Sequence, residues 1–290
     1  MKNKAVILIV LAGILWGTSG LFVNKLAPMD VSTSQMICLR ATVAAICMSL
    51  YFFVFDRKLF NISLKHLLFA IPSGFAMYGC GAAYYASIQA SSVSTAVILM
   101  YTAPVFVMAY SVAFLGEKLT KLKLFSVVII MVGCVLVSGI TDSVTFNVTG
   151  VVFGLLAGIS YSAYNVLTKI QMKKGFDAAT STMYCFVFMA VFSIMFCDFP
   201  GIFNFYTSYG NLFLILAVGI GFVTSVLPYF FYTISLKHLQ VGTASALGIV
   251  EPMAATIFSV LFLSEKLSIA SGVGIVLIIA SVLMLSTSKE

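Results

Sequence analysis

The stretches "TAVILMYTAPVFVMAYSVAFLGEKLT" (Thr95–Thr120) and "TASALGIVEPMAATIFSVLFLSEKLS" (Thr243–Ser268) decide the fold, because they are two copies of one pattern. A shift of 148 positions makes them identical at 11 of 26 residues, among them Pro104 with Pro252 and the closing Glu-Lys-Leu. Both copies lie inside long apolar runs, and the proline in each interrupts helical hydrogen bonding. The sequence therefore predicts two homologous halves, residues 1–145 and residues 146–290.

The composition predicts an all-α integral membrane protein. Of the 290 residues, 61% are hydrophobic and 9% are charged, whereas soluble domains carry about 25% charged residues. A spanning helix needs about 20 mainly apolar residues, and the apolar N-terminal run is interpreted as the first span, not as a cleaved signal peptide. Ten transmembrane helices are predicted, at residues 5–26, 34–55, 66–88, 93–115, 123–140, 149–170, 178–198, 210–236, 241–263 and 268–287.

Each half holds five predicted spans, and an odd number makes the second half enter the membrane from the opposite side. The prediction is therefore a 5+5 inverted-topology repeat, an arrangement that suits alternating access. Lysine and arginine favour the cytoplasmic side, and 13 of the 16 fall on the side of the N-terminus. The protein is expected in a bacterial-type plasma (inner) membrane, with both termini on the cytoplasmic side.

Several function classes lack the residues that they need. The net charge of +7 comes from dispersed positions in short loops, without the basic cluster typical of nucleic-acid binding. The "GTSG" of Gly17–Gly20 is similar to a serine protease motif, but His66 and His238 are predicted at helix ends far from Ser19. The six cysteines lack metal-ligand spacing. We expect no enzymatic activity, no cofactor, no metal and no nucleic-acid partner.

Three stretches carry a resemblance to a known family. They are "LWGTSGLFVNK" (Leu15–Lys25), "APVFVMAYSVAFLGEKLT" (Ala103–Thr120) and "EPMAATIFSVLFLSEKLS" (Glu251–Ser268), and Arg40 stands early in the second predicted span. With these residues the chain resembles the EamA-like family of the drug/metabolite transporter superfamily over nearly its whole length. The resemblance implies a ten-helix, 5+5 inverted-repeat carrier that moves small metabolites, often outward, and it does not say which metabolite.

Two charged residues lie inside predicted spans. Glu251 is the only acid in the middle of a span, where a charge costs about 2.5–3.5 kcal/mol on insertion scales. It could bind a substrate ammonium, couple transport to protons or serve as a structural hydrogen-bond acceptor, and the first half has Ala103 at this place. Arg40 could snorkel to the surface, pair with Glu251 or meet a substrate carboxylate.

Prolines and glycines recur at matching places in the two halves. Pro104 and Pro252 are predicted to be hinges beside the transport pathway, because each removes a helical hydrogen bond. Glycines spaced as GxxxG let helices approach closely. We interpret them as packing surfaces inside one subunit, so a monomer is expected; the pairs are Gly13/Gly17 and Gly154/Gly158.

Aromatic side chains in the spans predict a hydrated cavity, because phenol and indole groups need polar partners away from water. Trp16 is the only tryptophan, and its repeat mate is Tyr161. The predicted substrate-binding residues are Trp16, Tyr78, Tyr84, Tyr101, Tyr161, Tyr164, Asn165, Tyr232 and Glu251. Aromatic walls with few charges suit an amphipathic solute such as an amino acid, a nucleobase or a small drug.

The predicted function is secondary transport, because no ATP-binding motif is present. The solute is expected to be a small metabolite, with amino acids, aromatic metabolites or drugs as the candidates for export by alternating access. If Glu251 couples transport to protons, protons are a further partner. An importer of a nucleoside- or cofactor-like metabolite, a non-transporting membrane scaffold and an intramembrane enzyme are the alternatives.

Overall fold

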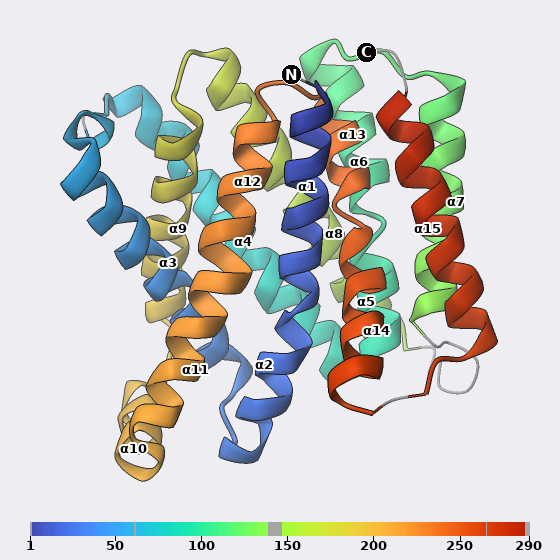
Figure 1. The fold of residues 1–290 in the computed structure, drawn as a ribbon. Coiled ribbons are helices and arrows are strands. Elements are labelled where there is room, and N and C mark those ends of the chain that lie inside the picture. Colours follow the sequence, from blue (N-terminus) through green and yellow to red (C-terminus); the bar gives the residue numbers. More distant parts are fainter. Residues whose placement is uncertain (1, 61, 139–146, 265, 288–290) are drawn as a thin grey trace.

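The structure, a computed structural model, describes the chain apart from residues 1, 61, 139–146, 265 and 288–290. Every regular element of this described part is a helix (Figure 1), which confirms the all-α prediction. Eight helical segments are long and apolar enough to cross a membrane, and a ninth is added if one bent pair counts as a span. The count of ten stays a prediction, since α7 (Lys121–Val137) and α9 (Ala178–Ile194) have only 17 residues each.

The first half follows the predicted spans closely. Ser32 caps one of its helices by accepting a hydrogen bond from Gln35 N, and Thr120 caps another by accepting from Lys123 N. Its elements are α1 (Lys2–Gly17), α2 (Ser19–Leu26), η1 (Ala27–Met29), α3 (Thr33–Phe55), η2 (Arg57–Phe60), α4 (Leu64–Ala90), α5 (Val93–Met100), α6 (Ala103–Tyr110), the π-helical turn η3 (Ser111–Leu115) and α7.

The second half differs from the first in its short elements and contains one additional helix. The segment after Cys197, expected to be a loop, contains a helix of its own, α10, which bends by 98° from α9. The elements are α8 (Val148–Lys173), α9, α10 (Phe199–Tyr209), α11 (Asn211–Gly221), the π-helical turn η5 (Phe222–Val226), α12 (Leu227–Ser235), α13 (Val241–Leu247), α14 (Val250–Phe262) and α15 (Ile269–Thr287).

The start of α1 and the end of α15 lie at the same end of the bundle, which we call the terminus side (Figure 1). This placement is what an even number of spans requires. The boundary predicted between the two halves, at residues 145 and 146, lies outside the described residues, as do Glu265 and Lys289.

Two spans are broken at equivalent positions of the repeat. The first break separates α5 from α6 at Tyr101 and Thr102, and the second separates α13 from α14 at Gly248 and Ile249. At each break the backbone bonds to the third residue back: Thr102 N donates to Leu99 O (3.2 Å) and Ile249 N to Ala246 O (3.1 Å). A proline follows each break by two or three positions, so the freed backbone groups fall where Pro104 and Pro252 forbid a regular helix.

The glycine pairs bring each broken span against a helix of the other half. A Cβ added at Gly17 of α1 would lie 2.7 Å from Ala254 Cβ and 2.8 Å from Ala255 N of α14. In the second half, a Cβ at Gly158 of α8 would lie 3.1 Å from Leu99 O, beside the other break. These glycines therefore permit close approach between the halves.

Candidate functional site

A cavity of about 840 Å³ lies between the two halves. Its wall is shared, with Trp16 and Arg40 from the first half and Tyr229 and Glu251 from the second. It extends away from the terminus side, because Val23 of α2 and residues near the start of α15 also line it. Figure 1 shows α2 and the start of α15 at the far end of the bundle. The polar residues at that rim are Ser138, Ser259, Lys266, Ser268 and Ser271.

Arg40 and Glu251 both face this cavity. Arg40 Nε donates a hydrogen bond to Ser225 Oγ at 3.3 Å. The Glu251 carboxylate feels the positive charge of Arg40 and has the Tyr101 hydroxyl beside it. The two charges are not in direct contact, because the one ion pair among the described residues joins Lys237 to Asp177 at 3.5 Å. Arg40 and Glu251 are thus neighbours across a cavity and not a closed salt bridge.

Aromatic rings form the wall at mid-depth. The rings of Trp16 and Tyr229 meet edge to face with centroids 5.0 Å apart, and Tyr161 adds a third ring from α8. Tyr84 and Tyr101, both predicted site residues, also line the cavity. Edge-to-face rings bury large apolar areas in fixed geometry, so this wall presents a rigid apolar surface to any bound solute.

Four residues of the predicted binding set do not line the cavity. Tyr164 and Tyr232 are buried one layer behind it, with ring centroids 5.8 Å from Tyr229 and from Trp16 respectively. Asn165 is buried and its Nδ2 donates to Tyr161 O at 2.9 Å. Tyr78 stacks on Phe196, centroids 5.7 Å apart. The first three support the wall from behind, and we leave all four out of the candidate site.

The two predicted hinge prolines line the cavity together. Pro104 stands in the first turn of α6 and Pro252 in the first turn of α14. Their role as hinges stays a prediction. Each proline follows a helix break that faces the cavity, because Tyr101 at one break and Gly248 at the other line it.

Sequence reasoning left out several residues around the cavity. Tyr85 and Cys80 line it from α4, and Tyr85 directly follows the predicted Tyr84 in the sequence. Ser225 lies behind Arg40 and is 1% exposed. It belongs to the π-helical turn η5, whose extra residue turns a side chain away from the regular helical face. No sequence pattern that we used indicates a π-helical turn.

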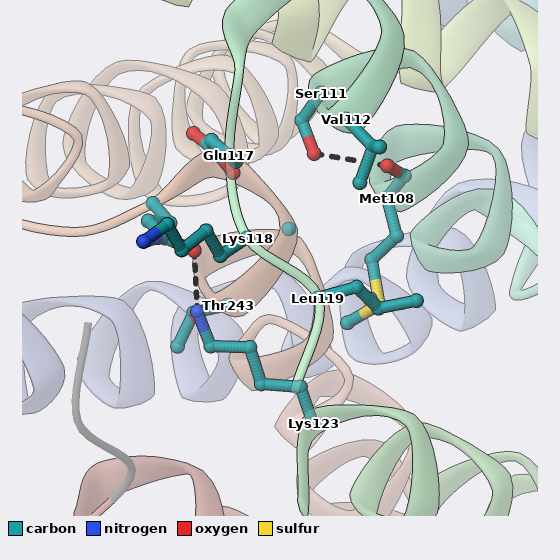
Figure 2. Close-up of a pocket in the computed structure, with 10 residues that line it drawn as sticks. Met108, Ser111, Val112, Glu117, Lys118, Leu119, Lys123 and Thr243 are labelled. Atoms are coloured by element: carbon teal, nitrogen blue, oxygen red, sulfur yellow. Dashed lines mark hydrogen bonds between the residues drawn. The ribbon is translucent and has the colours of Figure 1, made fainter. Parts of the chain in front are cut away.

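The terminus side is closed by polar contacts between the halves. Val241 N donates to Glu117 Oε1 at 3.1 Å, Lys173 Nζ donates to Leu115 O at 2.6 Å, and Lys123 Nζ donates to Gln240 Oε1. Figure 2 shows Glu117 and Lys123 facing the segment that carries Thr243. Glu117, Leu115 and Lys123 belong to the first half, and their partners to the second. We call these three contacts the terminus-side latch.

The charged residues of the latch differ in burial. Lys123 is 3% exposed, Glu117 is half-buried and Lys173 is exposed. Within the second half, Lys169 Nζ donates to Leu236 O and, at 2.7 Å, to Leu239 O. Charge-assisted hydrogen bonds out of water are among the stronger polar contacts. The described residues contain no group of three or more His, Cys, Asp or Glu arranged to hold a metal.

Comparison with known proteins gives a consistent result. The sequence profile of the EamA-like transporter family matches residues 3–139 and 148–287. An uncharacterized transporter of Archaeoglobus fulgidus is 25% identical over 298 residues, which cover 95% of this chain and 94% of that protein. The uncharacterized transporter YwfM of Bacillus subtilis is 26% identical over 296 residues, covering 100% and 96% of the two. The crystal structure of another protein resembles this chain with a TM-score of 0.82, over 98% of this chain and 96% of that one. At 15% sequence identity, this likeness supports the fold only.

Proposed function

The chain belongs to the EamA-like transporter family, and from that premise we propose that it is a secondary transporter that exports small amphipathic metabolites by alternating access. The observation that carries the proposal is the cavity of about 840 Å³ between the halves, which extends to one end of the bundle and is sealed by the latch at the other. A carrier needs such a site, reached from one side at a time.

The mechanism follows from the two sets of contacts. Gly17 and Gly158 allow the two halves to slide in close contact. The breaks between α5 and α6 and between α13 and α14 provide flexible backbone beside the cavity. Opening the terminus side requires the latch to separate and the far end to close. Net flux then follows the gradient of the solute or of a coupled ion. The solute is moved across the membrane without being chemically changed.

The direction and the solute are part of the proposal. With both termini cytoplasmic in a bacterial-type inner membrane, the cavity extends toward the outside, and this conformation is the one that releases an exported solute. The rings of Trp16, Tyr161 and Tyr229 suit an apolar body, and Arg40 and Glu251 suit polar ends. Amino acids and related aromatic metabolites combine both features. We propose that one chain suffices, because the cavity is complete within it.

The test of function is flux through liposomes that contain only this protein. We expect saturable counterflow of labelled leucine or phenylalanine without ATP, and none in protein-free liposomes. The assay is repeated with and without a pH gradient to identify proton coupling. Absence of flux for a panel of amino acids, nucleosides and aromatic drugs would contradict the proposal and favour a non-transporting scaffold.

Loosening the latch should open the terminus side. Glu117→Ala with Lys173→Ala removes one acceptor and one donor, each in a hydrogen bond to a charged group that contributes about 1.5–3 kcal/mol. The six native cysteines are first replaced, and Thr256→Cys then places a single cysteine on the cavity wall. An impermeant thiol reagent added on the terminus side should label this cysteine at least about tenfold faster in the latch variant than in the parent chain.

The matched control for the latch is Lys118→Ala, which removes a charge from the exposed residue next to Glu117. Its labelling rate should equal that of the parent chain. Equal labelling of the latch variant and this control would show that the latch does not hold the terminus side closed.

A further inference from the structure

Each charge in the cavity has a hydroxyl group from the opposite half beside it. Arg40 belongs to α3 of the first half, and its Nε donates at 3.3 Å to Ser225 Oγ in the turn η5 of the second half. Glu251 belongs to α14 of the second half, and the Tyr101 hydroxyl beside it comes from the break between α5 and α6 of the first half. The surroundings of both charged groups therefore depend on both halves.

The charges are near enough to interact and yet they are not paired. Arg40 and Glu251 share one cavity, the positive charge of Arg40 acts on Glu251, and no contact ion pair joins them in the described residues. With Nε occupied by Ser225, the two terminal nitrogens of Arg40 keep donors for a further acceptor. Charges at this depth are stable only with partners or water, so the gap between them is suited to a ligand that supplies the missing counter-charges.

We infer that the site selects a zwitterion, with its carboxylate on Arg40, its ammonium on Glu251 and its apolar group against the aromatic wall. This inference rests on the proposed transport function and narrows its substrate class. Ser225 and Tyr101 are then positioning residues, which act through Arg40 and Glu251 and not on the solute itself. Two charge-assisted hydrogen bonds of about 2.8 Å each, one at either end of the ligand, replace a direct contact between the two side chains.

The charges explain why a singly charged solute is the poorer ligand. An amine would neutralise Glu251 and leave Arg40 without a counter-charge, and a carboxylic acid would do the reverse. Leaving one member of a buried pair uncompensated is strongly unfavourable. The apolar part of the zwitterion has Trp16, Tyr161 and Tyr229 for contact, so neutral amino acids with a large side chain fit best.

Binding can be measured without transport, because Trp16 is the only tryptophan of the chain and lines the cavity. Its fluorescence in the purified, detergent-solubilised protein is titrated with phenylalanine, with phenylalaninamide, which lacks the carboxylate, and with N-acetylphenylalanine, which lacks the ammonium. We expect phenylalanine to bind at least about tenfold more tightly than either derivative.

The variants assign each end of the ligand to its side chain. Arg40→Gln should remove the preference for phenylalanine over phenylalaninamide, and Glu251→Gln the preference over N-acetylphenylalanine. Ser225→Ala should reduce the first preference and leave the second unchanged, which a merely structural role of Ser225 would not do. Ser225→Thr, which keeps the hydroxyl, should restore it. Thr224→Ala, which alters the neighbouring hydroxyl of the same turn, is the control and should change neither.

The outcomes separate this inference from the transport function. Equal binding of phenylalanine and either derivative, or preferences unchanged in Arg40→Gln, would overturn the zwitterion site. If an amine or a nucleoside shows saturable flux while zwitterions neither bind nor move, transport stands and the inference fails. If zwitterions bind with these preferences and no solute crosses the liposome membrane, the site stands and the transport function fails.

Discussion

Replacing Glu251 by glutamine is expected to lower solute flux by about 10- to 100-fold. Glutamine has nearly the same volume and keeps an oxygen beside Tyr101, so the change removes the charge and little else. A hydrogen bond to a charged group contributes about 1.5–3 kcal/mol, and 1.4 kcal/mol corresponds to a factor of ten. The measurement is the initial rate of counterflow in proteoliposomes with matched amounts of protein.

The control for Glu251 is Asp177→Asn. Asp177 is an acid at the surface, paired with Lys237, with both side chains more than 40% exposed. An exposed pair contributes little, so flux should stay at the parent level. If Glu251→Gln also kept the parent rate and its dependence on pH, the carboxylate would be a structural hydrogen-bond acceptor and both the substrate and the proton roles would be excluded.

Much of the fold could be predicted because the bilayer imposes simple rules. Apolar runs of about 20 residues become helices, since backbone groups in lipid must bond within their own segment. The repeated Pro104 and Pro252 correctly marked two spans with special backbone, and the structure places a break two or three residues before each. Helix α10 was missed because its 11 residues are too few to span a membrane and contain a proline and a glycine.

The site was predictable in its residue types and less so in its geometry. Glu251, Arg40 and Trp16 stood out because charges and an indole at bilayer depth need a polar or hydrated surrounding, and all three line the cavity. Tyr164 shares a helical face with Tyr161 by spacing, yet only Tyr161 reaches the cavity wall. Helical spacing fixes the direction of a side chain around its own helix, whereas depth and neighbouring helices decide which member of a stripe reaches a cavity.

Replacing Gly17 by valine is expected to destabilise the protein by about 1–3 kcal/mol, the usual effect of inserting carbon atoms into a close-packed contact. A single Cβ at Gly17 already lies 2.8 Å from the backbone nitrogen of Ala255 and 3.0 Å from Glu251 O. Backbone atoms cannot relieve the clash by rotating as a side chain can, so α1 and α14 must separate. The measurement is the thermal unfolding midpoint of the detergent-solubilised protein, which should fall.

Gly20 provides the matched control, because no atom lies within 4 Å of a Cβ built there. Gly20→Val should leave the midpoint unchanged, although Gly20 also lines the cavity. The contact of Gly17 with Glu251 O places this packing surface directly behind the charged residue of the site. Separation of α1 from α14 should therefore move Glu251 relative to Arg40 and reduce flux along with stability. A Gly17→Val protein with the parent midpoint would mean that the two halves do not depend on this close approach.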